Sequence, residues 1–356
     1  MYKDSRWNAA FDSPEKLRSV LGVIEQDGVL TAVGDPYQWF RDDGLRVLRI
    51  VRYACGMGYT FDALTLEALE RCAHYLEDVD QKSIGQELDG ILATGHVGWA
   101  LTIVPNVMCN AILELTDMVG FDQRTHWHAY DVLEHTIHVC NAVEAFTAGM
   151  ATQRLRWAAL LHDIGKPATL SLDQHNGGHF YGHAILSSIM AGRILRSLGL
   201  PTSMIRGAVV LIRCHDHIVQ PTPRSMRRVL AMMEEADPGN AFVLAHELMN
   251  LKRADAVSKA AKAAWYAVEL DKMDKLLREE KVKGAVLGVK DLAIDGSDVC
   301  DALGIEPGPM VGMALCELLQ SVIDCEVENT REDLVGELKR MRGNVLRRAP
   351  RKPQEG

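Results

Sequence analysis

Four segments of the sequence place a histidine or an aspartate where a helix would otherwise carry an apolar residue. They are His135 in 131–146, His162 in 154–163, His215 in 203–215 and Asp255 in 240–258. A buried polar side chain needs a partner, because an unpaired one costs several kcal/mol. One such histidine is usually a hydrogen-bonded core residue. Four that converge, with Asp163 directly after His162, instead favour a shared divalent cation.

Imidazole and carboxylate ligands together suit zinc, manganese, iron, cobalt or nickel. A bound cation of this kind lowers the pKa of water and polarises a phosphoryl oxygen. A site of these residue types can therefore activate water next to a phosphoryl group.

The elements that position these residues are predicted to be helices. Apolar residues recur with a period of 3.6 residues along most of the chain, and long strand-like alternations are missing, which predicts an all-α protein. The apolar segment GVLTAV, 28–33, is a candidate short strand.

The chain of 356 residues is longer than a single core usually takes, so two or three domains are expected. We expect a central domain at 119–275, because this part holds 11 of the 13 histidines. The predicted regions are a short lead at 1–34, a helical neck-like region at 35–118, the histidine-rich domain at 119–275 and a helical tail at 276–356.

Composition limits the function classes. A net charge of −9 argues against a whole-molecule affinity for nucleic acid, and 6% aromatic residues argue against base-stacking platforms. The scattered basic tail after 339 is either a solvated terminus or a weak nucleic-acid contact. Eight cysteines without a C-x-x-C pair are typical of reduced core residues. Neither a signal peptide nor a membrane span is recognisable, so we expect a cytoplasmic protein without a membrane partner.

The histidine and aspartate motifs resemble the H…HD…D signature of the HD superfamily of metal-dependent phosphohydrolases. The similar stretches are EHTIHV around His135, LLHDIGKP around the His162-Asp163 pair and LKRADA around Asp255. His183 and His215 occupy the order expected of members that hold two metals.

The resemblance implies roles for these residues. His135, His162, Asp163 and Asp255 would bind a first ion, and Asp163 would bridge to a second ion completed by His183 and His215. The ion or ions would be manganese, nickel, cobalt, iron, magnesium or zinc.

Two residues near the implied metal ligands are candidates for substrate contact. The resemblance implies that Lys166 meets substrate phosphate and takes part in catalysis with Asp163; the alternative is a cation at a helix C-terminus. His217 is a further candidate because it lies two residues beyond His215.

The flanking regions resemble class II tRNA nucleotidyltransferases, the family of CCA-adding enzymes. The segment DPYQWFRDDGLRVLRIVRYACGMGYTFDALTLEAL, 35–69, is similar to the neck of that family, and 287–334 looks like the segment after the HD domain in bacterial members. In the family, an E-D-x-x-R motif pairs with the incoming base. The matching residues here are Asp43 and Arg46, for which an i,i+3 salt bridge is the alternative role.

The chain also departs from the family. Only 34 residues precede Asp35, and they contain neither a Gly-Gly phosphate loop nor paired metal carboxylates, so we expect the nucleotidyltransferase head to be missing. The resemblance therefore predicts a metal-dependent phosphodiesterase or phosphatase that acts on nucleotide or RNA-end phosphoesters, such as 2′,3′-cyclic phosphates. The alternative is a tRNA-binding body that partners a separate nucleotidyltransferase head.

Overall fold

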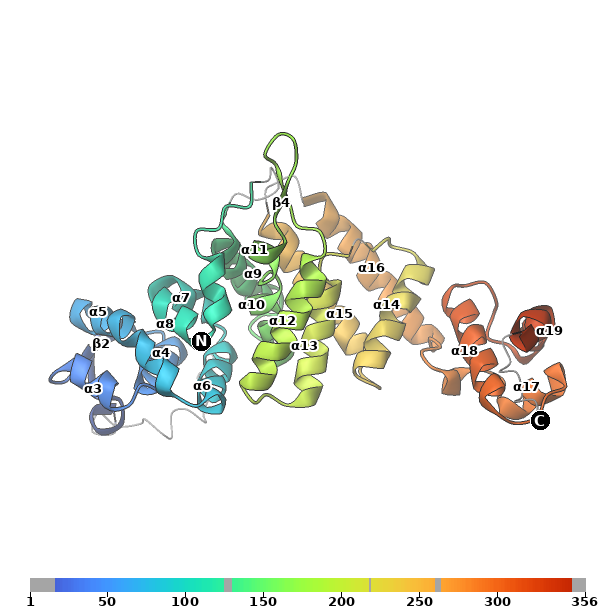
Figure 1. Cartoon of the computed structure of the whole chain (residues 1–356), viewed down its shortest axis with the longest axis horizontal. Coiled ribbons are helices and arrows are strands. Elements are labelled where there is room, and N and C mark those ends of the chain that lie inside the picture. The colour runs from blue at the N-terminus through green and yellow to red at the C-terminus, as the bar shows by residue number, and fades with distance from the viewer. Residues whose placement is uncertain (1–16, 125–129, 218, 260–263, 348–356) are drawn as a thin grey trace, which may run out of the picture. The chain divides into compact units, whose positions relative to one another are not determined.

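The computed structural model describes residues 17–124, 130–217, 219–259 and 264–347, and these are predominantly helical (Figure 1). The all-α class predicted from the sequence is confirmed. The chain divides into two compact units, of which unit 1 comprises Met1–His217 with Asn250–Ala267 and unit 2 comprises Ile218–Met249 with Val268–Gly356. The boundaries expected after residues 34, 118 and 275 stay a prediction.

Unit 1 contains most of the helices and all the strands of the described chain. Its helices before the candidate site are η1 (Leu17–Leu21), α3 (Pro36–Asp42), α4 (Arg46–Met57), α5 (Ala63–Cys72), η2 (Ala73–Asp78), α6 (Gln81–Ala93), α7 (Val97–Ile103), α8 (Pro105–Ala111) and η3 (Leu113–Met118). The helices around the site are α9 (Val132–Phe146), α10 (Gln153–Leu161), α11 (Lys166–Thr169), α12 (His183–Ser197), α13 (Thr202–Cys214) and the second half of α15 (Ala241–Val257).

Unit 2 is built from helices around its own apolar core. They are α14 (Pro223–Ala236), the first half of α15, most of α16 (Ala264–Lys283), η5 (Val289–Asp291), α17 (Gly296–Leu303), α18 (Pro309–Ile323) and α19 (Arg331–Arg347). Val299, Leu318 and Leu338 lie in the centre of the core that α17, α18 and α19 enclose. On α14, Arg228 pairs with Asp324, with Nε 2.6 Å from Oδ1.

Strands are short and belong to two small sheets in unit 1. β1 (Val23–Gln26) and β2 (Val29–Ala32) form an antiparallel hairpin with Gln26 opposite Val29, and β3 (Thr60–Phe61) adds to β2 in parallel. The strand predicted at 28–33 is therefore confirmed as β2. β4 (Ser171–Leu172) and β5 (Gly178–His179) form a second hairpin between α11 and α12.

The helices that carry the candidate site lie side by side in unit 1 (Figure 1). Asp131 and Thr152 begin α9 and α10 as N-caps, because their side chains accept hydrogen bonds from the backbone N–H of Glu134 and Leu155. α10 contacts α9 and α13, and its Trp157 is fully buried. α10 is thus the central helix against which the neighbouring helices are positioned.

The eight cysteines are free. Five of them are buried, as predicted, whereas Cys300 is half-buried and Cys316 and Cys325 are exposed, so the prediction that all are core residues is wrong for these three. Cys300 of α17 packs against the edge of the unit 2 core, whereas Cys316 of α18 and Cys325 just after α18 are exposed. No helix among the described residues is long and apolar enough to cross a membrane.

Gly85 allows α6 to approach the turn after α12. A Cβ atom at this position would lie 2.1 Å from the carbonyl oxygen of Leu198. The clash is with backbone, so a side chain there would force the two elements apart.

We predict that Gly85→Ala destabilises the protein by about 1–3 kcal/mol, the usual cost of overpacking. Gly56→Ala is the matched control in unit 1, because that position lies in α4 and a Cβ would meet Thr94 Cγ2 at an ordinary 3.8 Å. Gly56→Ala should leave the free energy of unfolding unchanged or raise it by up to about 1 kcal/mol. Chemical denaturation followed by circular dichroism measures both, and equal effects of the two substitutions would contradict the close approach at Gly85.

Candidate metal centre

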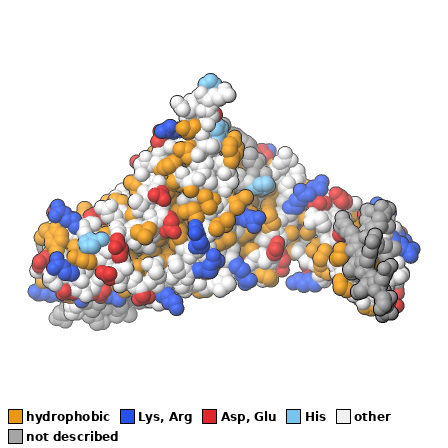
Figure 2. Space-filling model, viewed as in Figure 1, with side chains coloured by type: hydrophobic (Ala, Val, Ile, Leu, Met, Phe, Trp, Pro, Cys, Tyr) orange, Lys and Arg blue, Asp and Glu red, His pale blue; other side chains and the backbone are white. Residues whose placement is uncertain are grey.

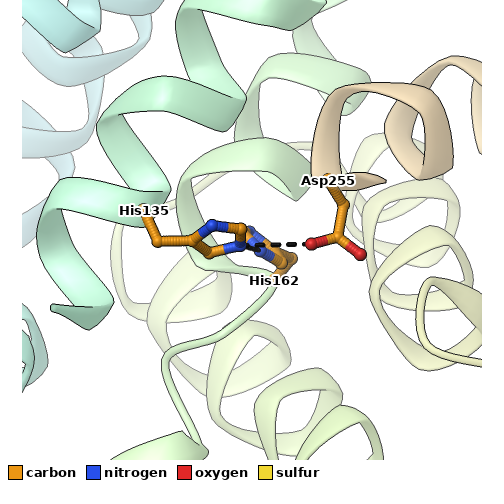
Figure 3. A group of neighbouring side chains, drawn as sticks. All are labelled: His135, His162 and Asp255. Carbon is orange, nitrogen blue, oxygen red and sulfur yellow. Dashed lines mark hydrogen bonds and ion pairs between the residues drawn. The ribbon is translucent and has the colours of Figure 1, made fainter. Parts of the chain in front are cut away.

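Six buried side chains of unit 1 converge on one point. They are His135, His162, Asp163, His183, His215 and Asp255. Figure 3 shows three of them, with His135 and His162 approaching each other and Asp255 facing them from α15. Their distances suit two overlapping groups of metal ligands, His135–His162–Asp255 and His162–Asp163–His215. The structure thus brings together all six residues that the sequence suggested as ligands.

Helix ends position most of these side chains. His162 is the C-cap of α10, His215 is the C-cap of α13, and His183 is the first residue of α12. His135 and Asp255 instead lie inside α9 and α15.

The turn after α10 lies directly against α12. Gly165 donates its backbone N–H to Ser187 Oγ at 2.9 Å. A Cβ on Gly165 would lie 2.8 Å from Ser187 N. A glycine is therefore needed to hold the turn with His162 and Asp163 against α12.

Asp163 lies at the centre, and its two oxygens face different histidines. Oδ2 is 3.1 Å from His162 Nε2 and 3.5 Å from His135 Nε2. Oδ1 is 3.3 Å from His183 Nε2 and 3.5 Å from His215 Nε2. The carboxylate therefore divides the imidazoles into two pairs, one on each oxygen.

The four imidazoles have the same orientation. Each directs Nδ1 at a backbone carbonyl: His162 at Ala159 O (2.8 Å), His183 at Phe180 O (2.8 Å), His215 at Ile212 O (2.7 Å) and His135 at Ser258 O (3.3 Å). A carbonyl oxygen can only accept, so these contacts place a proton on Nδ1 of each ring. Nε2 of each ring faces the centre, as metal ligation requires.

The Nε2 atoms lie close together in pairs. Nε2 of His135 lies 3.4 Å from Nε2 of His162, and Nε2 of His183 lies 3.3 Å from that of His215. When both nitrogens of a pair lack a proton, their lone pairs repel at such distances. Within the described part of the chain, neither oxygen of Asp163 accepts a well-aligned hydrogen bond, although both are buried. A divalent cation would satisfy the nitrogens and the carboxylate together, so the donor set fits a metal.

Charge and burial favour the ligand forms of these groups. Burial lowers the pKa of His135 and of His215, which favours the neutral rings. His183 differs, because Asp163 outweighs its burial and raises the pKa of its imidazole. Burial opposes the charge on Asp163, but neighbouring His162 and Lys166 lower the pKa of the carboxyl well below its usual range. Burial likewise opposes the charge on Asp255, and Lys259 outweighs it, so the pKa of Asp255 is also well below its usual range.

Two lysines accompany the two carboxylates. Lys166 Nζ lies 2.7 Å from Asp163 Oδ2 and donates to Gln123 Oε1 at 2.8 Å. Lys259 Nζ donates to Asp255 Oδ2 at 2.6 Å. Lys166 is the first residue of the four-residue α11 and is buried, and both roles considered for it from the sequence stay predictions.

Sequence reasoning missed three residues that support the centre, Gln123, Lys259 and Lys252. The buried Lys252 donates to the carbonyl oxygens of His215 (2.7 Å) and His217 (2.6 Å), and burial lowers the pKa of its amine to about 8. It fixes the backbone that carries His215. His217 itself is exposed, so its suggested contact with substrate stays a prediction.

Asp43 and Arg46, the residues of the expected base-reading motif, make internal contacts. Arg46 Nε lies 3.6 Å from Asp43 Oδ2, its Nη1 donates to Trp39 O, and its guanidinium stacks 3.8 Å above the Trp39 ring. Asp43 also pairs with Arg49 at 2.9 Å. The i,i+3 salt bridge considered from the sequence is thus present, and base recognition by this pair stays a prediction.

Comparison with known families gives two matches. A model described as the HD domain matches residues 132–279, and one described as tRNA nucleotidyltransferase domain 2 matches residues 229–338.

Curated relatives are tRNA nucleotidyltransferases. The chain is 28% identical over 299 residues to the CC-adding tRNA nucleotidyltransferase of Thermus thermophilus. The matched region covers 82% of this chain and 65% of the relative. It is 25% identical over 326 residues to the A-adding tRNA nucleotidyltransferase of Deinococcus radiodurans, covering 88% and 70%. The chain thus spans slightly less than two thirds of the Thermus enzyme.

A solved structure shares the fold. The crystal structure of the Bacillus stearothermophilus CCA-adding enzyme in complex with CTP matches with a TM-score of 0.59 at 20% identity, over 90% of this chain and 66% of that one. Taken with the family matches and the metal-ligand geometry, this chain carries an HD domain and a tRNA nucleotidyltransferase domain 2, and it resembles the body of a class II CCA-adding enzyme.

Proposed function

We propose that this chain is a metal-dependent phosphohydrolase that acts on nucleotide or RNA-end phosphoesters, such as 2′,3′-cyclic phosphates. One observation carries the proposal: the buried Asp163 carboxylate faces four imidazole Nε2 atoms at 3.1–3.5 Å, and neither of its oxygens accepts a well-aligned hydrogen bond from the described residues.

The proposed ligands form two sets that share Asp163. His135, His162 and Asp255 would hold the first ion with Oδ2 of Asp163, and His183 and His215 would hold the second with Oδ1. A divalent cation in such a site supplies Lewis acidity and lowers the pKa of water enough for attack on phosphorus near neutral pH.

The protein residues around the ligands bind and orient the substrate in this proposal. Gln123 holds the Lys166 ammonium beside Asp163, where its positive charge would balance the charge that develops on the phosphoryl oxygens. The Phe180 ring lies 5.5 Å from Lys166 Nζ and covers it on one side. Lys166 thereby has a fixed position instead of a flexible surface one.

We predict that divalent cations stabilise the protein through this centre. At 100 times its dissociation constant, a cation that binds only the folded chain adds about 2.7 kcal/mol, or roughly 5–10 °C in melting temperature. Differential scanning fluorimetry after chelation, with manganese, nickel, cobalt or magnesium added back, measures the shift. Asp163→Ala should lose it, and His96→Ala, at an exposed histidine outside the site, should keep it. An unchanged shift in Asp163→Ala would contradict the assignment.

We also predict phosphoester hydrolysis that depends on the same residues. The loaded protein should hydrolyse bis-p-nitrophenyl phosphate and 2′,3′-cyclic AMP, and Asp163→Ala should lower kcat/KM by about 100-fold or more. Lys166→Met should still bind metal, because all six proposed ligands remain, but it should lose turnover, because the ammonium that would contact phosphate is removed together with its ion pair to Asp163. Absence of turnover with every metal, or unchanged turnover in Asp163→Ala, would contradict the proposed phosphohydrolase function.

A second candidate is a non-catalytic tRNA-binding body that works with a nucleotidyltransferase head. Two findings favour it: the match of residues 229–338 to tRNA nucleotidyltransferase domain 2, and the tRNA nucleotidyltransferase activities for which the relatives are named. This candidate predicts a gel shift with tRNA at a stated salt concentration that Asp163→Ala leaves unchanged. Incorporation of labelled CTP or ATP into tRNA is the companion assay, with and without an added head. A protein that gives no tRNA shift at low salt contradicts this candidate.

A further inference from the structure

The helical hairpin of α12 and α13 carries positive charge alone. Between His183 and Cys214 the sequence has four arginines and no aspartate or glutamate, in a chain whose net charge is −9. The four are Arg193, Arg196, Arg206 and Arg213, which we call the arginine hairpin. A local charge of +4 stands out against the acidic balance of the whole chain.

All four side chains of the arginine hairpin are exposed, and none forms an ion pair with a described residue. Two other arginines of unit 1 are ion-paired. Arg52 pairs with Glu87 at 3.0 Å, and Arg156 pairs with Glu144 at 2.6 Å. The guanidinium groups of the hairpin therefore keep their full hydrogen-bonding capacity for a ligand, five N–H donors each.

The arginines share one region of the surface. α12 and α13 are neighbouring helices joined by the short turn 198–201. The Arg196 guanidinium lies over Gly192, beside Val209 of α13. A Cβ on Gly192 would lie 3.4 Å from Val209 Cγ2 and 3.5 and 3.6 Å from the two Nη atoms of Arg196. Lys82 of α6 adds a cation at the turn, where its side chain fills the space next to Gly199. Figure 2 shows Lys and Arg side chains gathered over the region that Figure 1 labels α12 and α13.

Both ends of this hairpin belong to the candidate metal centre. His183 is the first residue of α12, and His215 directly follows α13. Arg193 lies ten residues after His183 along α12, which is about 15 Å at 1.5 Å per residue. Arg206 and Arg213, seven residues apart, lie on one side of α13 and return toward His215. A strand of a few nucleotides spans such a distance.

We propose that the arginine hairpin binds the phosphate backbone of an RNA whose end reaches the metal centre. Guanidinium groups contact phosphates through paired N–H donors, and several of them spaced along two helices match a repeating row of negative charges. Binding of an acidic peptide or a lipid surface would not explain why the row of arginines leads to the metal centre. An RNA explains it, because its end carries a phosphoester. The inference rests on the proposed function only for what happens to the RNA after it binds.

The test measures binding of a fluorescein-labelled 12-nucleotide single-stranded RNA to the full chain by fluorescence anisotropy at several salt concentrations. Four phosphate contacts contribute a slope of about −2.8 in log K against log salt, so affinity from this surface falls about 50-fold between 50 and 200 mM. Replacing all four arginines of the hairpin by glutamine should weaken binding at 50 mM at least tenfold and remove most of this slope. Replacement by lysine should preserve the slope.

The matched control removes four positive charges elsewhere. Arg71, Lys272, Arg331 and Arg340 are exposed and ion-paired, so their replacement by glutamine changes net charge equally without touching the hairpin. It should leave RNA affinity within about twofold, because these four side chains are already paired with carboxylates. Equal losses in both quadruple variants, or unchanged binding in the hairpin variant, would overturn the inference.

Two further measurements separate the possible outcomes. If the hairpin variant loses binding to phosphatidylserine vesicles but not to RNA, the surface is a membrane contact and the inference is wrong. Hydrolysis of bis-p-nitrophenyl phosphate and the melting temperature should be unchanged in the variant, which shows that it folds and that its site is intact. A wild-type chain that binds RNA through the hairpin without hydrolysing any phosphoester would contradict the proposed function and leave this inference standing.

Discussion

The buried carboxylate of Asp163 is the constraint on which the centre of unit 1 depends. A lone ionised carboxylate in an apolar interior costs far more than the net stability of a domain, so partners must surround it. Here four imidazoles and one ammonium lie within 2.7–3.5 Å of its oxygens. These groups come from α9, α10, α11, α12 and α13. The register of these helices is thus fixed around one side chain, and a shift in any of them would leave charge unpaired.

Three of the four histidines combine a structural and a ligand role. In His162, His183 and His215, Nδ1 contacts the carbonyl oxygen three residues earlier, at 2.7–2.8 Å. For His162 and His215 this carbonyl belongs to the last turn of a helix, and the carbonyl of Ile212 also accepts the backbone N–H of His215 at 3.4 Å. The bond to Nδ1 fixes the ring and turns Nε2 toward the centre. The ring orientation is therefore a local property of the chain and requires little from the rest of the fold.

This local character explains how much of the centre the sequence could predict. Helical periodicity identified His135, His162, His215 and Asp255, because each interrupts an apolar face that the structure buries. His183 begins its helix after a glycine-rich loop, so periodicity gave no signal and only the family resemblance indicated it. Gln123 and Lys252 act through contacts 43 and 37 residues away in sequence, which no local pattern encodes. The strand at 28–33 was predictable from its apolar residues, but its parallel partner β3 depends on tertiary contact.

The division of donors between the two oxygens of Asp163 makes the two halves of the centre unequal. The half on Oδ2 has two imidazoles and a second carboxylate, since His135 Nε2 lies 3.1 Å from Asp255 Oδ1. The half on Oδ1 has two imidazoles besides the shared carboxylate, and the exposed Asp216 lies 3.9 Å from Nδ1 of His183. Coulomb attraction between a divalent cation and each added negative charge is large at low dielectric. The Oδ2 half also carries the ammonium groups of Lys166 and Lys259, which offset part of this attraction. The affinity of the Oδ1 half for a cation would depend more strongly on what else approaches it, such as the negative charge of a phosphoester.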